Sequence, residues 1–144
     1  MSVLTTSTTR TDAGGTRIRP APHHAERAGP GEAAADRLAD LGHAADVVCV
    51  TSPGLVFDAV QARGGRGAGE SWILDAAFPG RRAAPLVTLL DGHPHTLAFL
   101  AGVHGVRAAH LGVTQFGQSG DLESVYRHHG VDDGSAVAAA LDLL

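Results

Sequence analysis

Apolar residues follow two kinds of pattern over residues 32–144. Three short runs are apolar almost throughout, which is typical of strands buried on both faces of a sheet. These runs are DVVCVT (46–51), PLVTLLD (85–91) and VRAAHLGV (106–113). Helical patterns cover 32–42, 55–63, 71–78 and 94–103, and two more follow near the C-terminus. Buried strands separated by helices predict a three-layer α/β/α domain with a mainly parallel sheet.

Residues that start and stop helices mark out these segments. Gly42 closes the first predicted helix, and Pro94 is expected at the first position of the fourth. Ser119 is predicted to cap a helix that ends at Gly130, and Ser135 is predicted to cap the terminal helix. The predicted domain therefore extends to the last residue of the sequence.

Residues 1–31 differ from the rest of the chain. They are rich in Thr, Gly, Pro and Arg and show neither helical nor strand periodicity. We expect a flexible lead-in over 1–31, followed by one α/β domain over 32–144. The alternative is that TRIR (16–19) forms a short edge strand.

Composition excludes several classes of chemistry. The formal net charge of −4 gives no basic surface for nucleic acid, so we expect no nucleic-acid partner. All eleven cationic residues are Arg, and without Lys the chain cannot form a Schiff base or complete a standard phosphate loop. No apolar run has the length of a membrane span, and the N-terminus lacks the order of a signal peptide. We expect a cytoplasmic protein without membrane contact.

The single cysteine, Cys49, cannot form an internal disulfide, which also favours a reducing compartment. It lies among valines in the first apolar run. A reactive thiolate needs a polar, positively charged setting, so we expect a buried apolar side chain and no catalytic thiol.

The segment LGVTQFGQSG (111–120) has the glycine spacing of a phosphate loop. Gln118 stands where that loop requires Lys, which argues against nucleotide hydrolysis. Backbone amides around Gly117, Gln118 and Ser119 could still hold a simple anion at a helix start, or the segment could form an interface. The alternative is that the glycines only let the chain turn from a strand into a capped helix.

A second polar loop, DGHPHT (91–96), follows the second predicted strand. Asp91, His93 and His95 lie where α/β proteins commonly place their sites. Two histidines could share a metal with His104 or His110, although no spacing matches a known closed site. No activated nucleophile stands near Asp91 and His93 in the sequence. We therefore assign no catalytic, cofactor-binding or metal-binding residue.

Three segments carry a resemblance to a known family: DVVCVTS (46–52), ESWILDAAFPGRRAAPLVT (70–88) and LGVTQFGQSGDLESVYRHHGVD (111–132). From about residue 32 to the end, the chain resembles the C-terminal domain of the transketolase family of thiamine-diphosphate enzymes. Within the family it is most similar to the homodimeric pyruvate dehydrogenase decarboxylating components. The LG-x-x-x-FG-x-S pattern in the last segment is the most specific mark.

The resemblance implies an α/β domain that supports assembly and contributes no catalytic residue. It implies that thiamine diphosphate and Mg²⁺ are bound by a separate partner chain. It also implies a buried strand before the first helix, for which residues 1–31 offer only TRIR.

The expected function is therefore that of a non-catalytic subunit. The chain would be the detached C-terminal domain of a split transketolase-like or pyruvate dehydrogenase-like enzyme that transfers two-carbon or acyl units, and it would form a homo- or hetero-oligomer. The alternatives are a stand-alone anion- or metal-binding regulatory module and a degenerate fragment without function.

Overall fold

The computed structural model describes residues 2–7, 29–80, 83–115 and 117–144. The elements are, in order, β1 (Ser2–Ser7), α1 (Pro30–Asp40), β2 (Ala44–Cys49), α2 (Pro53–Arg63), α3 (Trp72–Ala77), β3 (Leu86–Leu89), α4 (His95–Ala98), the 3₁₀ helix η2 (Phe99–Val103), β4 (Ala108–Leu111), α5 (Leu122–His129) and α6 (Asp133–Leu143). The chain is an α/β protein, as the pattern of apolar runs predicts.

The four strands form one mixed sheet in the order β2-β1-β3-β4. Strand β1 is antiparallel to both β2 and β3, whereas β3 and β4 are parallel. The three strands predicted from the apolar runs therefore all point the same way, and β1 lies between two of them. The prediction of a mainly parallel sheet missed this central antiparallel strand.

The expectation of a flexible lead-in is wrong for Ser2–Ser7, which form β1. Val3 and Leu4 are both fully buried, on opposite faces of the sheet. The segment SVLTTS has only these two large apolar residues among hydroxyl residues, so it shows no clear strand period, although Thr favours strands. The predicted edge strand TRIR (16–19) and the rest of the lead-in up to residue 28 lie outside the described residues.

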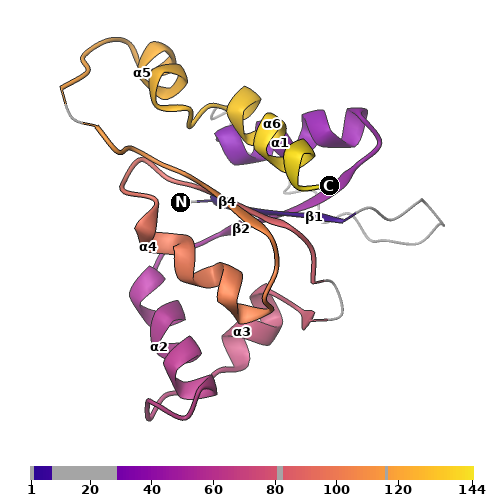
Figure 1. The fold of residues 1–144 in the computed structure, drawn as a ribbon, viewed down its shortest axis with the longest axis vertical. Helices are drawn as coiled ribbons and strands as arrows, with labels where there is room; N and C mark the ends of the chain where they lie inside the picture. Colours follow the sequence, from indigo (N-terminus) through magenta and orange to yellow (C-terminus); the bar gives the residue numbers. More distant parts are fainter. Residues whose placement is uncertain (1, 8–28, 81–82, 116) are drawn as a thin grey trace, which may run out of the picture.

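Helices cover both faces of the sheet (Figure 1). Helices α1 and α6 lie on one face, where the core consists of Leu4, Ala34, Leu38, Val87, Leu89, Ala136, Val137 and Ala140. Helices α3, α4 and η2 contribute to the core on the other face, which consists of Val3, Val50, Phe78, Leu86, Leu90, Leu97 and Leu100. Small alanines on α1 and α6 let these helices approach each other and the sheet closely.

Two helix starts differ from the prediction. Asp121, and not Ser119, is the N-cap of α5, and Asp132, and not Ser135, is the N-cap of α6. In both cases the aspartate carboxylate reaches the backbone amide three residues later, which satisfies a donor at the helix start. Gly130 ends α5 with a φ of 64°, as predicted.

The predicted helix over 94–103 is divided into α4 and η2, and Pro94 is the residue before α4.

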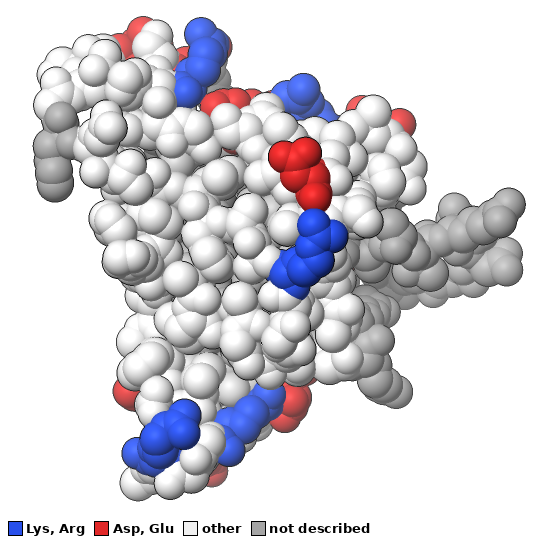
Figure 2. Space-filling model, viewed as in Figure 1, with Lys and Arg blue, Asp and Glu red and all other residues white. Residues whose placement is uncertain are grey.

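Figure 2 shows the surface over this part of the molecule. On that face, charged side chains lie at the top and at the bottom, one acidic and one basic side chain lie together right of the centre, and the area to the left of these two is uncharged.

Candidate functional site

The two loops singled out from the sequence meet at one edge of the sheet. They follow β3 and β4, which are parallel with Leu89 opposite Leu111, so both strands end on the same side. The amide of Val113 donates a hydrogen bond of 2.9 Å to the carbonyl of Gly92. The DGHPHT loop and the start of the LGVTQFGQSG segment, at Gly112 and Val113, therefore lie side by side.

The close contact between the two loops requires a glycine at position 112. A Cβ atom at this position would lie 2.5 Å from the carbonyl oxygen of Gly92 and 2.9 Å from the nitrogen of Pro94. Because both are backbone atoms, a side chain at Gly112 would force the two loops apart. The first glycine of the phosphate-loop-like pattern thus serves loop packing.

Asp91, His93 and His95 are all exposed in the DGHPHT loop. The two imidazole rings lie 4.3 Å apart, and the amide of His95 makes a long 3.4 Å hydrogen bond to Nδ1 of His93. Among the described residues, no three His, Cys, Asp or Glu side chains are grouped so that they could hold a metal ion.

The two histidines considered as a third ligand have other partners. The Nε2 atom of His104 is hydrogen-bonded to the carbonyl of Phe78, and Nδ1 of His110 lies 3.0 Å from the hydroxyl of Thr88. Thr88 is fully buried and stands opposite His110 in the strand register. Partial burial lowers the pKa of His110, because desolvation disfavours the charged imidazolium. This Thr88–His110 pair was not found from the sequence, since it depends on the register of β3 and β4.

The loop before α5 exposes Gln118 and Ser119, and Gly117 adopts a positive φ of 103°. The Asp121 carboxylate accepts hydrogen bonds from the amide and the hydroxyl of Ser124, at 3.0 and 2.7 Å. These hydrogen bonds lower the pKa of Asp121 and keep the carboxylate charged. A negative group thus already lies at the start of α5, where a bound anion would be repelled.

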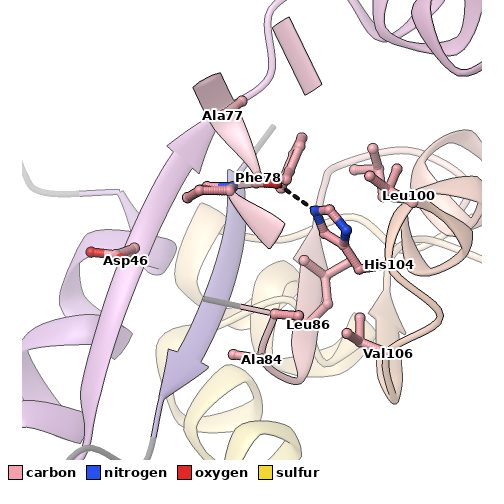
Figure 3. Close-up of a pocket in the computed structure, with 11 residues that line it drawn as sticks. Asp46, Ala77, Phe78, Ala84, Leu86, Leu100, His104 and Val106 are labelled. Atoms are coloured by element: carbon pink, nitrogen blue, oxygen red, sulfur yellow. Dashed lines mark hydrogen bonds between the residues drawn. The ribbon is translucent and has the colours of Figure 1, made fainter. Parts of the chain in front are cut away.

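A pocket lined by His104, Phe78 and Leu86 lies near the start of β3, at the end of the strand opposite the two loops. Figure 3 shows the side chains that line it. Its cavity of about 40 Å³ is well below the roughly 300–1,000 Å³ of pockets that hold small-molecule ligands. Its described lining is apolar except for Asp46 and His104. The pocket is therefore too small for a cofactor-sized molecule.

The expectation that Cys49 is a buried apolar side chain is wrong, because Cys49 is exposed. It is the last residue of β2, an edge strand of the sheet, and it belongs to neither core. Within the described residues, no helix is both long and apolar enough to span a membrane.

Comparisons with protein families, with curated proteins and with solved structures give no match to this chain.

Proposed function

We propose that this chain is a non-catalytic subunit: the detached C-terminal domain of a split thiamine-diphosphate-dependent enzyme of the transketolase or pyruvate dehydrogenase type. It would assemble with a separate chain that carries the cofactor. The observation that carries the proposal is the nearly uncharged surface formed by the DGHPHT loop, α4, η2 and the LGVTQFGQSG loop. We call this surface the α4 face.

The α4 face is poor in charge over a long stretch of sequence. Residues 83–120 contain only two acidic or basic residues, Asp91 and Arg107, apart from histidines. The uncharged area in Figure 2 lies over this part of the molecule. Depletion of charged residues distinguishes the cores of protein interfaces from ordinary surface. The α4 face is therefore suited to contact another protein.

Two further features support the resemblance to the transketolase family. The chain opens with a buried strand before its first helix, as the resemblance implies, although Ser2–Ser7 supply it in place of TRIR. The LG-x-x-x-FG-x-S segment begins at Leu111, the last residue of β4, and Gln118 and Ser119 are exposed. We accordingly propose the finer description of the fold as a transketolase C-terminal-like α/β/α domain.

Following the resemblance, the proposal assigns thiamine diphosphate, Mg²⁺ and the cleavage beside a carbonyl to the partner chain. This subunit would contribute the surface that holds the assembly together.

Co-purification with the product of a neighbouring gene tests the proposal. We expect the two chains to elute together and thiamine-dependent activity to require both. Thr96→Arg places a charge at an exposed position of α4, and Ala39→Arg places the same charge at an exposed position of α1 on the opposite face. We expect T96R to weaken the complex and A39R to leave it unchanged.

Failure to associate with any thiamine-dependent protein would refute the proposal. Calorimetry with inorganic phosphate and with zinc gives a second, independent reading. Saturable binding of either one by the isolated chain would favour a stand-alone binding module.

A further inference from the structure

The DGHPHT loop begins with an aspartate that is followed directly by a glycine. This pair, Asp91–Gly92, is one of two Asp-Gly pairs in the chain, and the other is Asp133–Gly134. Aspartate before glycine can rearrange without an enzyme, because glycine has no side chain to keep its amide nitrogen away from the aspartate carboxyl group. The structure places the two pairs in different surroundings, so their reactivity can be compared.

The reacting groups of Asp91–Gly92 are not held in place by the described part of the chain. The pair lies between β3 and α4, outside any helix or strand, and Asp91 is exposed. Among the described residues, no hydrogen bond or ion pair engages the Asp91 carboxylate or the Gly92 amide. The Asp91 side chain is therefore free to turn toward the Gly92 amide.

The same groups of Asp133–Gly134 are held in α6. Asp133 and Gly134 are the first two residues of the helix, whose dihedral angles fix the position of the Gly134 amide. That amide donates to the Asp132 carboxylate, and the Asp133 carboxylate accepts a 2.7 Å hydrogen bond from Arg37. The first turn of α6 must therefore open before the two groups can react.

We infer that Asp91 is a site of spontaneous isoaspartate formation and that the fold protects Asp133 from the same reaction. The amide nitrogen of Gly92 attacks the side-chain carbonyl carbon of Asp91, and the amide proton leaves with the carboxyl hydroxyl as water. Water then opens the resulting succinimide ring at either of its two carbonyls. One opening restores aspartate and the other gives isoaspartate, so the net reaction is an isomerisation.

Isomerisation of Asp91 adds a carbon atom to the main chain directly before Gly92. The Gly92 carbonyl accepts the 2.9 Å hydrogen bond from Val113, and it lies so close to Gly112 that a Cβ atom there would come within 2.5 Å of it. A contact this tight between two backbones has no room for a longer chain. The modified loop therefore loses its hydrogen bond to Val113. This inference does not rest on the proposed thiamine-dependent assembly.

Ageing of the folded full chain in water enriched in ¹⁸O tests the inference. Each ring opening leaves one ¹⁸O in a carboxyl group, so the label records the reaction whichever product forms. Digestion after arginine, in ordinary water, gives peptides 83–107 and 128–144, of which the first has Asp91 as its sole acidic residue and the second contains Asp133. We expect roughly tenfold more label in 83–107, and a second chromatographic peak of that peptide that carries isoaspartate.

Asp91→Glu is the matched variant, because it keeps the charge but would have to close a larger ring that forms more slowly. We expect D91E to leave 83–107 unlabelled and in a single peak. The amide of Val113 should exchange its hydrogen roughly tenfold faster in the isoaspartate form than in D91E, because its hydrogen bond to Gly92 is lost.

Unfolding in guanidinium chloride separates the effect of the fold from that of the sequence. There the first turn of α6 is lost, and we expect both peptides to take up label at similar rates. A preference for 83–107 that persists in the unfolded chain would overturn the protection that we assign to α6.

Three results with the folded protein would overturn the inference itself. These are a peptide 83–107 that stays unlabelled, equal label in the two peptides, or a D91E variant that takes up label like the wild type. None of these measurements involves a thiamine-dependent chain, so the outcome is independent of the co-purification experiment.

Discussion

Helices α5 and α6 follow each other in the chain and begin with the same arrangement of atoms. In each, an N-cap aspartate accepts hydrogen bonds of 3.0 and 2.7 Å from the amide and hydroxyl of a serine three residues later. Their surroundings differ completely. Helix α6 buries Ala136, Val137 and Ala140 against α1 and the sheet, whereas α5 buries no residue.

The comparison separates two contributions to helix formation. The cap fixes where a helix begins, and the same Asp-x-x-Ser arrangement does so in both places. Burial decides how strongly the helix is held, because a helix of eight residues is marginal in water by itself. We therefore expect α5 to open locally far more easily than α6 in the monomer.

The largest difference in stability between the core around α6 and helix α5 is expected when a leucine is shortened to alanine. Leu38 of α1 is fully buried in the core that α6 shares, and Leu38→Ala should lower the free energy of unfolding by about 2–5 kcal/mol. Leu122→Ala in α5 removes the same atoms from an exposed site and should change it by less than about 0.5 kcal/mol. Urea denaturation of dilute protein measures both. Equal losses would show that α5 is as much a part of the folded core as α6.

The strands and helices between residues 44 and 113 could be predicted because their apolar residues form unbroken short runs or recur at helical spacing. Strand β1 could not, because Val3 and Leu4 are its only large apolar residues and its place in the sheet depends on β2 and β3. The helix starts were misplaced by two or three residues, since Asp and Ser both cap helices and the sequence around Ser119 and Ser135 offers both.

The candidate site was predictable in part. The loops after β3 and β4 could be picked out because polar and glycine-rich segments follow apolar strands. Their contact through Gly112 depends on a close backbone approach that sequence spacing does not encode. The partners of His104 and His110 lie 26 and 22 residues away, and only the folded chain brings them together.

A smaller difference in stability between α6 and α5 is expected when the N-cap aspartate of each helix is removed. Asp132→Ala should lower the free energy of unfolding by about 1 kcal/mol, because α6 is part of the core. Asp121→Ala should speed hydrogen exchange of the amides of Ser124 and Val125 while leaving the urea midpoint nearly unchanged. Hydrogen exchange with mass spectrometry, together with urea denaturation, distinguishes the two. A large global loss for D121A would contradict the comparison.

A still smaller difference between α5 and α6 is expected at the C-terminal ends of the two helices. Arg107 donates hydrogen bonds of 2.8 and 3.1 Å to the carbonyls of Leu143 and Asp142 and so holds the last turn of α6. Arg107→Gln should cost about 0.5 kcal/mol and speed amide exchange at Leu144. Arg127→Gln, which removes the exposed ion pair of α5, is the matched control and should leave exchange at Leu144 unaltered. If both variants loosen the last turn of α6 equally, Arg107 does not hold that turn through its hydrogen bonds.

The smallest expected effect is that the stability contributed by the Asp132 cap depends on pH. Partial burial would raise the pKa of Asp132, but the hydrogen bonds from Ser135 outweigh it, so the pKa lies below its usual value. The cap's contribution is then fully present above the pKa of the unfolded chain, about 3.9, and is lost as the pH falls through the lower folded value.

Denaturation midpoints from about pH 5 down to about pH 2 measure this loss. The wild type should lose stability more steeply there than Asp132→Asn, whose neutral side chain keeps a hydrogen bond to the helix start. Identical slopes would mean that Asp132 contributes nothing as a charged group.

The central position of β1 has a consequence for how the sheet is assembled. Ser2–Ser7 are the only described link between β2 and the β3–β4 pair, and Ser2 lies opposite both Cys49 and Leu89. On the ribosome, this strand cannot meet both neighbours until residue 89 has emerged. A chain that lacks residues 1–7 should leave the sheet in two separate pieces, and a synthetic peptide of that sequence should rejoin them in trans.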